Sequence, residues 1–368
     1  MQIDRPRLRR YGRAASRWAR VLLPRRRRPG LRVFYGHDEV PTPGAPVAGG
    51  SAKFQRLAVR FPNEPTDFTL LYLGSTWLPR DVRALLLVAR RRRIPVVVNQ
   101  SGVAYPGWAG AATEGINRQF RRALLGADHV LYQSEFCKRS ADEFLGAPTG
   151  SWEVLYNAVD VEHFSPAAVP PGDGPVLLLA GDQTQPYRLE LALRTLTHVL
   201  RSHPDATLVV TGRLVSSPEP LIVELDLAGK VEFAGRYAQR DAPALFRRAH
   251  LLLHTKVKDP CPTAVIEGMA CGLPVVYAAS GGTVELVGDE AGVGVPHSDG
   301  WDRDEPPGAD ELADAVTRVL ADAPAYAAAA RRRAVERFAL GPWLERHEDL
   351  FTQLVKGDAP RARASRAH

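Results

Sequence analysis

Short apolar runs alternate with longer amphipathic stretches along most of the chain. In the first half, runs rich in Val, Leu, Phe and Tyr begin near Leu31, Phe68, Ile94, Ala127 and Trp152, and stretches with helical spacing occupy 51–59, 80–91, 111–125 and 135–145. In the second half, apolar runs begin near Val176, Thr207, Val231, His250, Pro274 and Val293, and helical stretches occupy 189–201, 242–248, 263–271, 310–320, 326–338 and 343–354. Strands that alternate with helices in this way predict stacked βαβ units.

A Pro- and Gly-rich segment separates the two halves. Residues 165–175 contain the run AAVPPGDGP, which is typical of a linker. A length of 368 residues suffices for two domains. We therefore predict an α/β protein of two Rossmann-like doubly wound domains, residues 31–165 and 172–340, that face each other across a cleft. Ligands of such domains bind at the carboxyl ends of the strands.

The composition is that of an ordinary globular protein, with 45% hydrophobic and 24% charged residues. The apolar runs are far shorter than a membrane span, and the N-terminus lacks the apolar region of a signal peptide. Cys137, Cys261 and Cys271 form neither a CxxC pair nor a Cys/His cluster, which favours a reducing cytoplasm and no zinc site.

The N-terminal extension, residues 1–30, is strongly basic, with eleven arginines against one acidic residue, Asp4. Between positions 8 and 22, apolar residues recur at three- and four-residue spacing: Leu8, Tyr11, Ala15, Trp18 and Leu22. This pattern predicts that residues 1–28 form a basic helix on an anionic membrane surface, peripheral to the inner face of the cell membrane. A disordered tail or a general preference for Arg are the alternatives. No motif for DNA or RNA accompanies the charge, so we do not expect a nucleic-acid partner.

The segment DPCPTAVIEGMACG, residues 259–272, holds the richest candidate chemistry. Thr263 is predicted to cap a helix that ends before Gly272, and a helix N-terminus after a strand and loop favours an anion such as phosphate. Two carboxylates, Asp259 and Glu267, flank that position and can only accept hydrogen bonds. A nucleotide sugar matches both features, since it offers a diphosphate and several hydroxyls. The plainer interpretation is a buried capped helix with one incidental Glu.

The spacing of this segment resembles the donor-site motif of the family 4 (group 1) glycosyltransferases, which have the GT-B fold. Asp259 stands where the family usually has Glu. Further resemblance lies in the sequences at 155–166, 231–254 and 280–295, and the similarity covers residues 120 to 355. It implies that the helix at 341–356 crosses back onto the first domain.

The resemblance implies transfer of a hexose from a nucleoside diphosphate sugar to a glycan, lipid or small-molecule acceptor, with retention of configuration. It assigns Glu267 to the ribose hydroxyls, Asp259 to the hexose hydroxyls, and Thr263 to the diphosphate. The remaining donor-side residues that it implies are the amides of Ala264 and Val265 for the diphosphate, Arg236 and Tyr237 for the base, and His254 for the cleft wall.

The chain departs from the family pattern after the first strand of the second half. Relatives have an Arg and a Lys there that neutralise the diphosphate, whereas Asp182 occupies the Arg position and Tyr187 lies near the Lys position. Arg188 and Arg213 are the candidate replacements, because a guanidinium binds phosphate in two-pronged fashion. A solvent-exposed Arg188 at a helix start is the plainer interpretation.

The first domain offers weaker candidates at predicted strand ends. Gly49 and Gly50 precede a helix, as in the Gly-rich loop of the family, although a plain βα connection has the same appearance. His37 and Asp38 follow the first strand and are candidates to bind the acceptor or act as a base. Asn99–Gln100–Ser101 ends the third strand, where many relatives have a His.

No metal or organic cofactor is expected. The Asp-x-Asp at 302–304 lies in a Gly-, Pro- and acid-rich insertion, which predicts a solvated loop rather than a metal site. P-loop, GxSxG and HExxH motifs are missing from the sequence. Two alternatives to glycosyl transfer stay open: a nucleotide-sugar epimerase of the same fold, and a catalytically silent GT-B protein that only binds.

Overall fold

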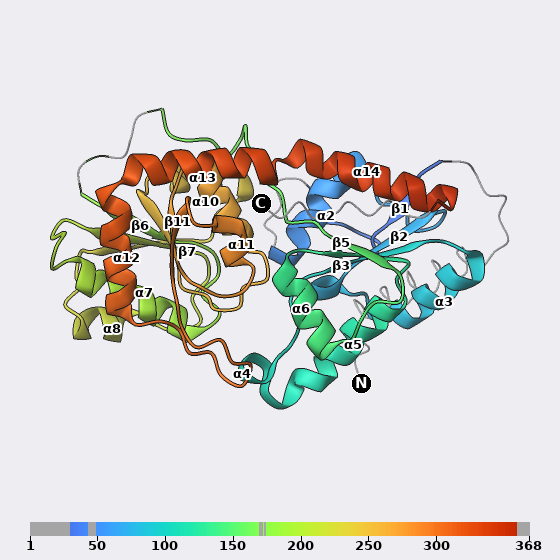
Figure 1. The fold of residues 1–368 in the computed structure, drawn as a ribbon, viewed down its shortest axis with the longest axis horizontal. Coiled ribbons are helices and arrows are strands. Elements are labelled where there is room, and N and C mark those ends of the chain that lie inside the picture. The colour runs from blue at the N-terminus through green and yellow to red at the C-terminus, as the bar shows by residue number, and fades with distance from the viewer. Residues whose placement is uncertain (1–29, 43–48, 169–171, 173, 359–368) are drawn as a thin grey trace, which may run out of the picture.

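The computed structural model describes residues 30–42, 49–168, 172 and 174–358. The basic segment 1–28, predicted to contact membranes, and part of the predicted linker lie outside the described residues. Two parallel sheets lie side by side, each covered by helices on both faces (Figure 1), which confirms the predicted doubly wound α/β architecture. Within the described residues, no helix combines the length and the apolar character needed to cross a membrane.

The first sheet has five strands in the order β1-β2-β3-β4-β5. They are β1 Val33–Phe34, β2 Leu70–Gly74, β3 Val96–Gln100, β4 His129–Tyr132 and β5 Ser151–Val154. The helices are α2 Gly49–Arg60, α3 Val82–Arg92, the short α4 Pro106–Ala109, α5 Thr113–Leu125 and α6 Glu135–Phe144, with 3-10 turns η1 Ser75–Trp77 and η2 Gly110–Ala112. Strands β2, β3 and β4 are buried throughout, because α3, α5 and α6 cover one face of the sheet and α2 covers the other.

The second sheet has six strands in the order β11-β10-β9-β6-β7-β8. They are β6 Val176–Leu179, β7 Thr207–Thr211, β8 Val231–Gly235, β9 Leu251–His254, β10 Val275–Ala278 and β11 Gly292–Val295. The helices are α7 Pro186–Val199, α8 Glu219–Glu224, α9 Ala242–Phe246, α10 Thr263–Ala270, α11 Thr283–Val287, α12 Ala309–Ala321 and α13 Ala323–Phe338, with the turn η3 Gln239–Asp241. Helices α9, α10 and α13 cover one face, and α7 and α12 cover the other.

The last helix, α14 Leu340–Lys356, packs on the first sheet. Figure 1 shows α13 and α14 running one after the other along the same side of both sheets. Where they meet, the chain pairs with the segment that leaves the first sheet: Val159 N–H donates to Phe338 O at 2.8 Å, and Leu340 N–H donates to Val159 O at 2.9 Å. Trp343 and Phe351 are buried against the first domain. The two segments that connect the domains on this side therefore lie together. We call Val159 and residues 338–340 the hinge.

A second connection lies on the opposite side of the molecule. Residues 296–308, here called the strap, join β11 to α12 and reach down to α4 (Figure 1). Gly107 N–H donates to Trp301 O at 2.8 Å, and the Trp301 indole N–H donates to Glu143 at 2.8 Å. The Trp301 ring packs against Phe136 and Phe144 of α6. The strap, which belongs to the second domain, is thus attached to α4 and α6 of the first domain.

The strap also corrects the prediction of a solvated loop at 302–304. The Asp304 carboxylate accepts a hydrogen bond from the Tyr105 hydroxyl at 3.0 Å and pairs with the buried Lys258 ammonium at 3.2 Å. Its side chain is only 10% exposed. The local sequence is acidic and rich in Gly and Pro, but the partners of Asp304 lie 199 (Tyr105) and 46 (Lys258) positions earlier in the chain, so no local pattern could reveal them.

We predict that Trp301→Ala detaches the strap. Trp301 is half-buried, so we expect a loss of about 1–2 kcal/mol, less than for a fully buried Trp. Amide hydrogen exchange should become faster in peptides covering α4 and the strap. Trp152→Ala is the matched control, because Trp152 packs within the first domain on Tyr132 and leaves the strap untouched. Equal exchange of α4 in wild type and Trp301→Ala would contradict the prediction.

Candidate active site

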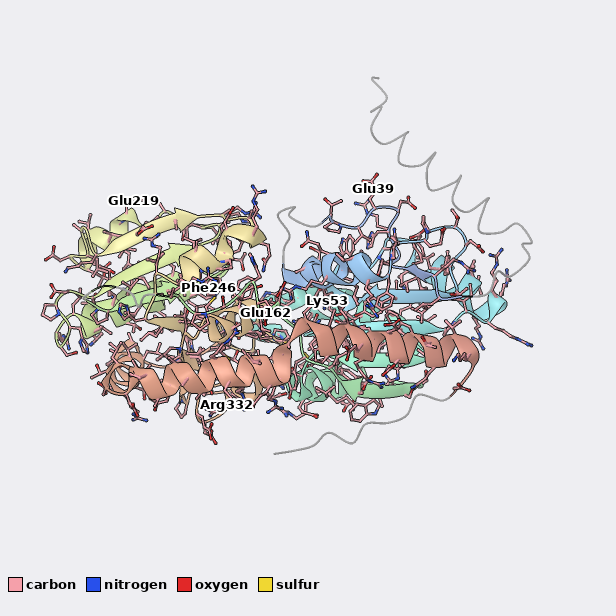
Figure 2. The ribbon with its side chains drawn as sticks, turned by 90° about the horizontal axis from the view of Figure 1, so that it is seen from above. Glu39, Lys53, Glu162, Glu219, Phe246 and Arg332 are labelled. Atoms are coloured by element: carbon pink, nitrogen blue, oxygen red, sulfur yellow. The ribbon has the colours of Figure 1, made fainter. Side chains whose placement is uncertain are left out.

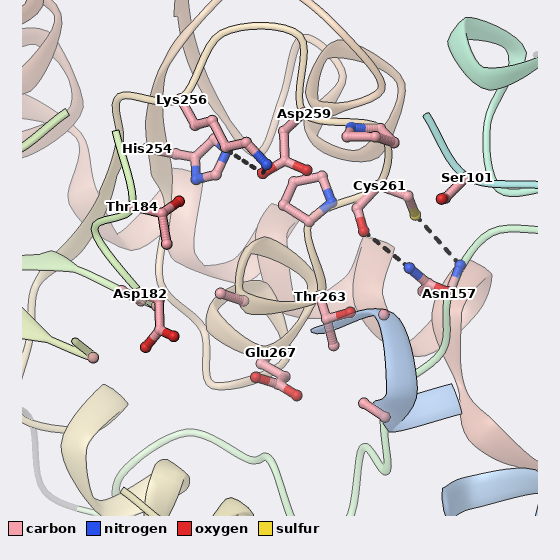
Figure 3. Close-up of a pocket in the computed structure, with 18 of the residues that line it drawn as sticks. Ser101, Asn157, Asp182, Thr184, His254, Lys256, Asp259, Cys261, Thr263 and Glu267 are labelled. Atoms are coloured by element: carbon pink, nitrogen blue, oxygen red, sulfur yellow. Dashed lines mark hydrogen bonds and ion pairs between the residues drawn. The ribbon is translucent and has the colours of Figure 1, made fainter. Parts of the chain in front are cut away.

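A cleft of about 560 Å³ lies at the carboxyl ends of the strands of both sheets and has walls from both domains (Figure 3). Most residues predicted from the sequence to bind a ligand line it: Gly50, Arg188, Arg213, Arg236, Tyr237, His254, Asp259, Thr263, Ala264 and Glu267. The fold therefore brings together residues that are far apart in the sequence, as expected for the strand ends of doubly wound sheets.

Helix α10 opens into this cleft with its N-terminus. Thr263 is the first helical residue and Pro262 holds the cap position, so the prediction of Thr263 as N-cap is wrong by one residue. Pro262 keeps φ at −65°, and its carbonyl accepts the Val265 N–H at 3.1 Å. The amides of Thr263 and Ala264 precede this first hydrogen bond and are left for a ligand. The Val265 amide, predicted to bind diphosphate, donates to the Pro262 carbonyl instead. The Val265 side chain lies in the hydrophobic core.

The loop that leads into α10 is fixed by hydrogen bonds from both domains. The Asp259 carbonyl accepts Gly282 N–H at 2.8 Å, the Pro260 carbonyl accepts the Ser134 hydroxyl at 2.7 Å, and the Cys261 carbonyl accepts the Asn157 amide at 2.9 Å. Figure 3 shows Asn157 facing Cys261 across the domain boundary. The position of the α10 N-terminus thus depends on contacts with the first domain.

Asp259 lies in the cleft beside two basic groups. Its Oδ2 is 3.2 Å from Lys256 Nζ and 3.5 Å from His254 Nε2. Burial alone would raise the pKa of Asp259, but Lys256 and His254 outweigh it and hold the pKa well below its usual range. Burial lowers the pKa of His254, so the ring is neutral near pH 7 and can donate to the carboxylate only if Nε2 carries its proton. Asp259 is therefore a fixed negative charge.

Glu267 lies one turn into α10 and faces the cleft (Figure 3). Its Oε1 is 3.1 Å from Arg56 Nη2, on α2 of the first domain, and also accepts a hydrogen bond from the Gln239 amide. Burial raises the pKa of Glu267, and the Arg56 guanidinium and the Gln239 amide only partly oppose this shift. Both contacts go to Oε1, so among the described residues the second oxygen is left for a ligand.

Arg188 is buried rather than solvated as in the plainer interpretation of the sequence. Its side chain lines the cleft from α7 and donates to the Asp182 carbonyl at 2.8 Å, and only 4% of the residue is exposed. A buried guanidinium that reaches the cleft suits the role of a missing phosphate-binding residue.

Asp182, at the position where relatives have Arg, lies between two exposed arginines. Arg213 Nε is 3.9 Å from Asp182 Oδ2, and Arg236 Nε is 4.0 Å from Asp182 Oδ1. The Arg213 backbone N–H also donates to Asp182 at 2.8 Å. Asp182 therefore holds both arginines at the mouth of the cleft and offsets part of their charge.

The first-domain predictions divide into one residue at the cleft and three outside it. Gly50 lines the cleft, and a Cβ at this position would lie 2.6 Å from Thr76 Oγ1, so the close approach requires glycine. Gly49 begins α2 and does not line the cleft. His37 stacks on Trp77 with ring centroids 3.8 Å apart, and Asp38 is exposed, so neither reaches the cleft as predicted for the acceptor side.

The part of the chain that matches known proteins includes the second-domain wall of the cleft. The family model for glycosyl transferases group 1 matches residues 160–337, the part that contains α10 and the cleft residues of the second sheet. Over these residues, just under half of the chain, the sequence is similar to the group 1 glycosyltransferases. It is 26% identical over 208 residues to an uncharacterized glycosyltransferase of Methanocaldococcus jannaschii, which covers 52% of the chain and 51% of the relative. It is also 26% identical to the D-inositol 3-phosphate glycosyltransferase of Mycobacterium tuberculosis, over 58% of the chain and 46% of the relative.

Solved structures show the fold of the chain. Sucrose-phosphate synthase from Thermosynechococcus elongatus superposes with a TM-score of 0.64 at 19% identity, over 83% of the chain and 77% of the synthase. Anabaena HepE in complex with UDP superposes with a TM-score of 0.63 at 19% identity, over 82% and 81%. These neighbours confirm the predicted GT-B fold. The chain spans about half the length of the curated relatives it matches.

Among the cleft residues that the sequence analysis missed are Lys256, Gln239 and Lys53, together with Arg56, which contacts Glu267. Lys256 lies two residues after strand β9, so its place near a strand's carboxyl end was a usable signal. Gln239 lies in η3, a turn too short to show a period. Lys53 and Arg56 lie on α2 at helical spacing with its apolar residues, and only their partners in the folded protein distinguish them from a solvated face.

The described residues contain no group of three or more His, Cys, Asp or Glu side chains arranged to hold a metal ion. The expectation that no metal is needed stays a prediction.

We predict that Arg56→Met destabilises the protein by about 2–3 kcal/mol, because it leaves the Glu267 carboxylate buried without its charged partner. The folded-state pKa of Glu267 is already raised, so protonation stabilises the folded state as the pH falls. The deficit should therefore be largest above neutral pH and shrink toward about pH 5. Urea denaturation at several pH values measures it.

Arg60→Met is the matched control for this prediction. Arg60 lies one turn further along the same helix and pairs with Glu348, but both side chains are about half exposed, so its removal should cost less than about 1 kcal/mol. Equal losses for the two variants, or a deficit independent of pH, would show that the pair is not held in a desolvated cleft.

Proposed function

We propose that the chain transfers a hexose from a nucleoside diphosphate sugar to a glycan, lipid or small-molecule acceptor, with retention of configuration. The observation that carries this proposal is the open N-terminus of α10, which lies in an interdomain cleft between the carboxylates of Asp259 and Glu267. Structural neighbours support the donor class, since Anabaena HepE has been solved with UDP and with UDP-glucose.

The donor would lie along the second-domain wall. Glu267 accepts hydrogen bonds from the ribose hydroxyls through its second oxygen. Asp259, which stays ionised, accepts them from hexose hydroxyls. The amides of Thr263 and Ala264 bind the diphosphate together with the positive end of the α10 dipole. Arg236 and Tyr237 lie toward the base.

During transfer, the bond between the sugar C1 and the diphosphate oxygen breaks, and its electron pair passes to that oxygen. The acceptor hydroxyl forms the new bond to C1 on the same face, and its proton goes to the departing diphosphate. The residues of the cleft stabilise the charge that develops on the diphosphate, through the α10 amides and the buried guanidinium of Arg188. The cations and the helix dipole act without a metal in this proposal.

A panel of nucleoside diphosphate sugars, with and without a membrane extract as a source of acceptor, tests the proposal. A transferase should release nucleoside diphosphate faster when extract is present. An epimerase would release nucleotide without any acceptor. A protein that binds donor but releases nothing under either condition would be a catalytically silent member of the fold.

We predict that Glu267→Ala abolishes transfer and weakens donor binding by about 1.5–3 kcal/mol, the value of a hydrogen bond to a charged group. Calorimetric titration with the donor, beside circular dichroism to show folding, provides the measurement. Glu348→Ala, which removes an exposed carboxylate from α14, should bind donor like wild type. Near-normal turnover and unchanged donor affinity of Glu267→Ala would refute the assignment.

We further propose that the arginine-rich residues 1–28 hold the enzyme at an anionic membrane surface, on the cytoplasmic side. The proposal rests on the sequence alone, because these residues lie outside those that the structure describes. Deletion of 1–28 should abolish co-sedimentation with anionic vesicles and leave donor binding intact. Binding of the full chain should also weaken with salt, because the Debye length falls from about 10 Å at 0.1 M to about 3 Å at 1 M. Equal sedimentation of both forms would contradict the proposal.

A further inference from the structure

One lysine on the first-domain wall of the cleft is buried beside neutral groups. Lys53 lies on α2, one turn after Gly50, and faces the second domain (Figure 2); it is only 4% exposed. Its ammonium donates to the Asn99 side-chain carbonyl. The groups that act on its charge are the thiols of Cys261 and Cys137, and burial raises the pKa of both, to about 12 for Cys137, so neither is an anion.

The neighbours of Lys53 are locked in a chain of amide hydrogen bonds. Asn99 Oδ1 also accepts from Gln133 Nε2 at 2.6 Å, and Gln133 Oε1 accepts from Asn157 Nδ2 at 3.1 Å. The same Asn157 amide donates to the Cys261 carbonyl, just before α10. This chain fixes the acceptor for one ammonium proton and places Lys53 beside the loop that presents the helix N-terminus. Among the described residues no second acceptor bonds the ammonium, so its other two N–H groups are left for a ligand.

Three of the four cations on the second-domain wall have acidic partners, which Lys53 lacks among the described residues; the fourth, Arg188, donates to the Asp182 backbone carbonyl. Lys256 pairs with Asp259, and Arg213 and Arg236 both lie within 4.0 Å of Asp182. Burying an ammonium without an anion is costly, and burial lowers the pKa of Lys53 to about 8, so it is still mostly protonated at neutral pH. Such a charge is best explained by an anion that arrives with the ligand.

We propose that Lys53 binds a phosphate group of the substrate from the first-domain side of the cleft, opposite the α10 N-terminus. The inference rests on the proposed glycosyl transfer. In the second domain, Asp182 offsets part of the charge of Arg213 and Arg236. Lys53 would supply a positive charge for the phosphate from the first domain instead. If the phosphate is the diphosphate of the donor, its oxygen gains the electron pair of the broken C1–O bond, and Lys53 stabilises that charge without giving up a proton. A phosphate on the acceptor has the same chemistry and is the other possible source.

The test compares Lys53→Met, which keeps the chain length and removes the charge, with Lys53→Arg, which keeps the charge. The probes are the diphosphates and monophosphates of uridine, guanosine and adenosine, and inorganic phosphate alone or with saturating nucleoside diphosphate. We expect Lys53→Met to weaken phosphate-dependent binding about 10- to 100-fold and Lys53→Arg to restore part of it. If Lys53→Met loses affinity for nucleoside diphosphates but not for monophosphates, Lys53 binds the diphosphate of the donor. If Lys53→Met loses affinity only for inorganic phosphate added to the nucleotide complex, Lys53 binds a phosphate of the acceptor.

Lys138→Met is the control, because Lys138 lies on α6 of the same domain and pairs with Asp142 outside the cleft. It should bind phosphate normally, and Lys53→Met should be as stable as wild type or more so. A Lys53→Met protein that binds every probe like wild type and is less stable would overturn the inference. If the wild type binds inorganic phosphate through Lys53 but no nucleotide, the proposed function fails and the Lys53 site stands.

Discussion

The loop from Asp259 to Pro262 is the point on which the rest of the cleft depends. Its three successive carbonyls accept hydrogen bonds from Gly282, Ser134 and Asn157, and the last two belong to the first domain. A buried loop must satisfy its carbonyls, so these donors set the course of the chain into α10. The orientation of the helix N-terminus is therefore a property of the closed two-domain structure and not of the second domain alone.

Electrostatics in the cleft follow from the same closure. Arg56 reaches Glu267 only because α2 meets α10 across the domain boundary, and its guanidinium opposes the effect of burial on that carboxylate. Another inter-domain contact is made by Glu285, whose carboxylate accepts the Glu135 and Phe136 amides at the start of α6, both at 2.7 Å. A carboxylate at a helix N-terminus is favourable for the same reason that a phosphate would be at α10. Opening the domains would expose both carboxylates to water and separate them from their first-domain partners, whereas Gln239 would stay beside Glu267.

The sequence predicted the elements whose signal is local. The alternation of apolar runs and amphipathic stretches identified all the strands of both sheets to within a few residues, because buried parallel strands are apolar throughout. The short helices α4, α8 and α11 were missed, since four to six residues do not complete a recognisable period. The cap of α10 was displaced by one residue because Pro262 needs no side-chain bond to start a helix.

Features that arise from long-range contacts were predicted less well. The strap looked like a solvated loop because the partners of Trp301 and Asp304 lie on α4 and α6 or just before them. His37 and Asp38 follow a strand, as many ligand-binding residues do; His37 stacks on Trp77 and neither residue lines the cleft, and their role on the acceptor side stays a prediction. Arg188 was placed correctly in the cleft, while its burial could not be foreseen in a chain so rich in arginine.

The hinge and the strap together limit how the two domains can move. The hinge is made of backbone hydrogen bonds between Val159 and residues 338–340, and the strap lies on the opposite side, where aromatic rings and the Lys258–Asp304 pair hold it. If only the hinge joined the domains, they could rotate apart about it. Because the strap joins them on the opposite side, it must be released before the cleft can widen there. Since Lys258 directly precedes Asp259, the strap is anchored at the same loop that forms the donor wall. Opening of the cleft and disturbance of that wall are therefore coupled through one short stretch of chain.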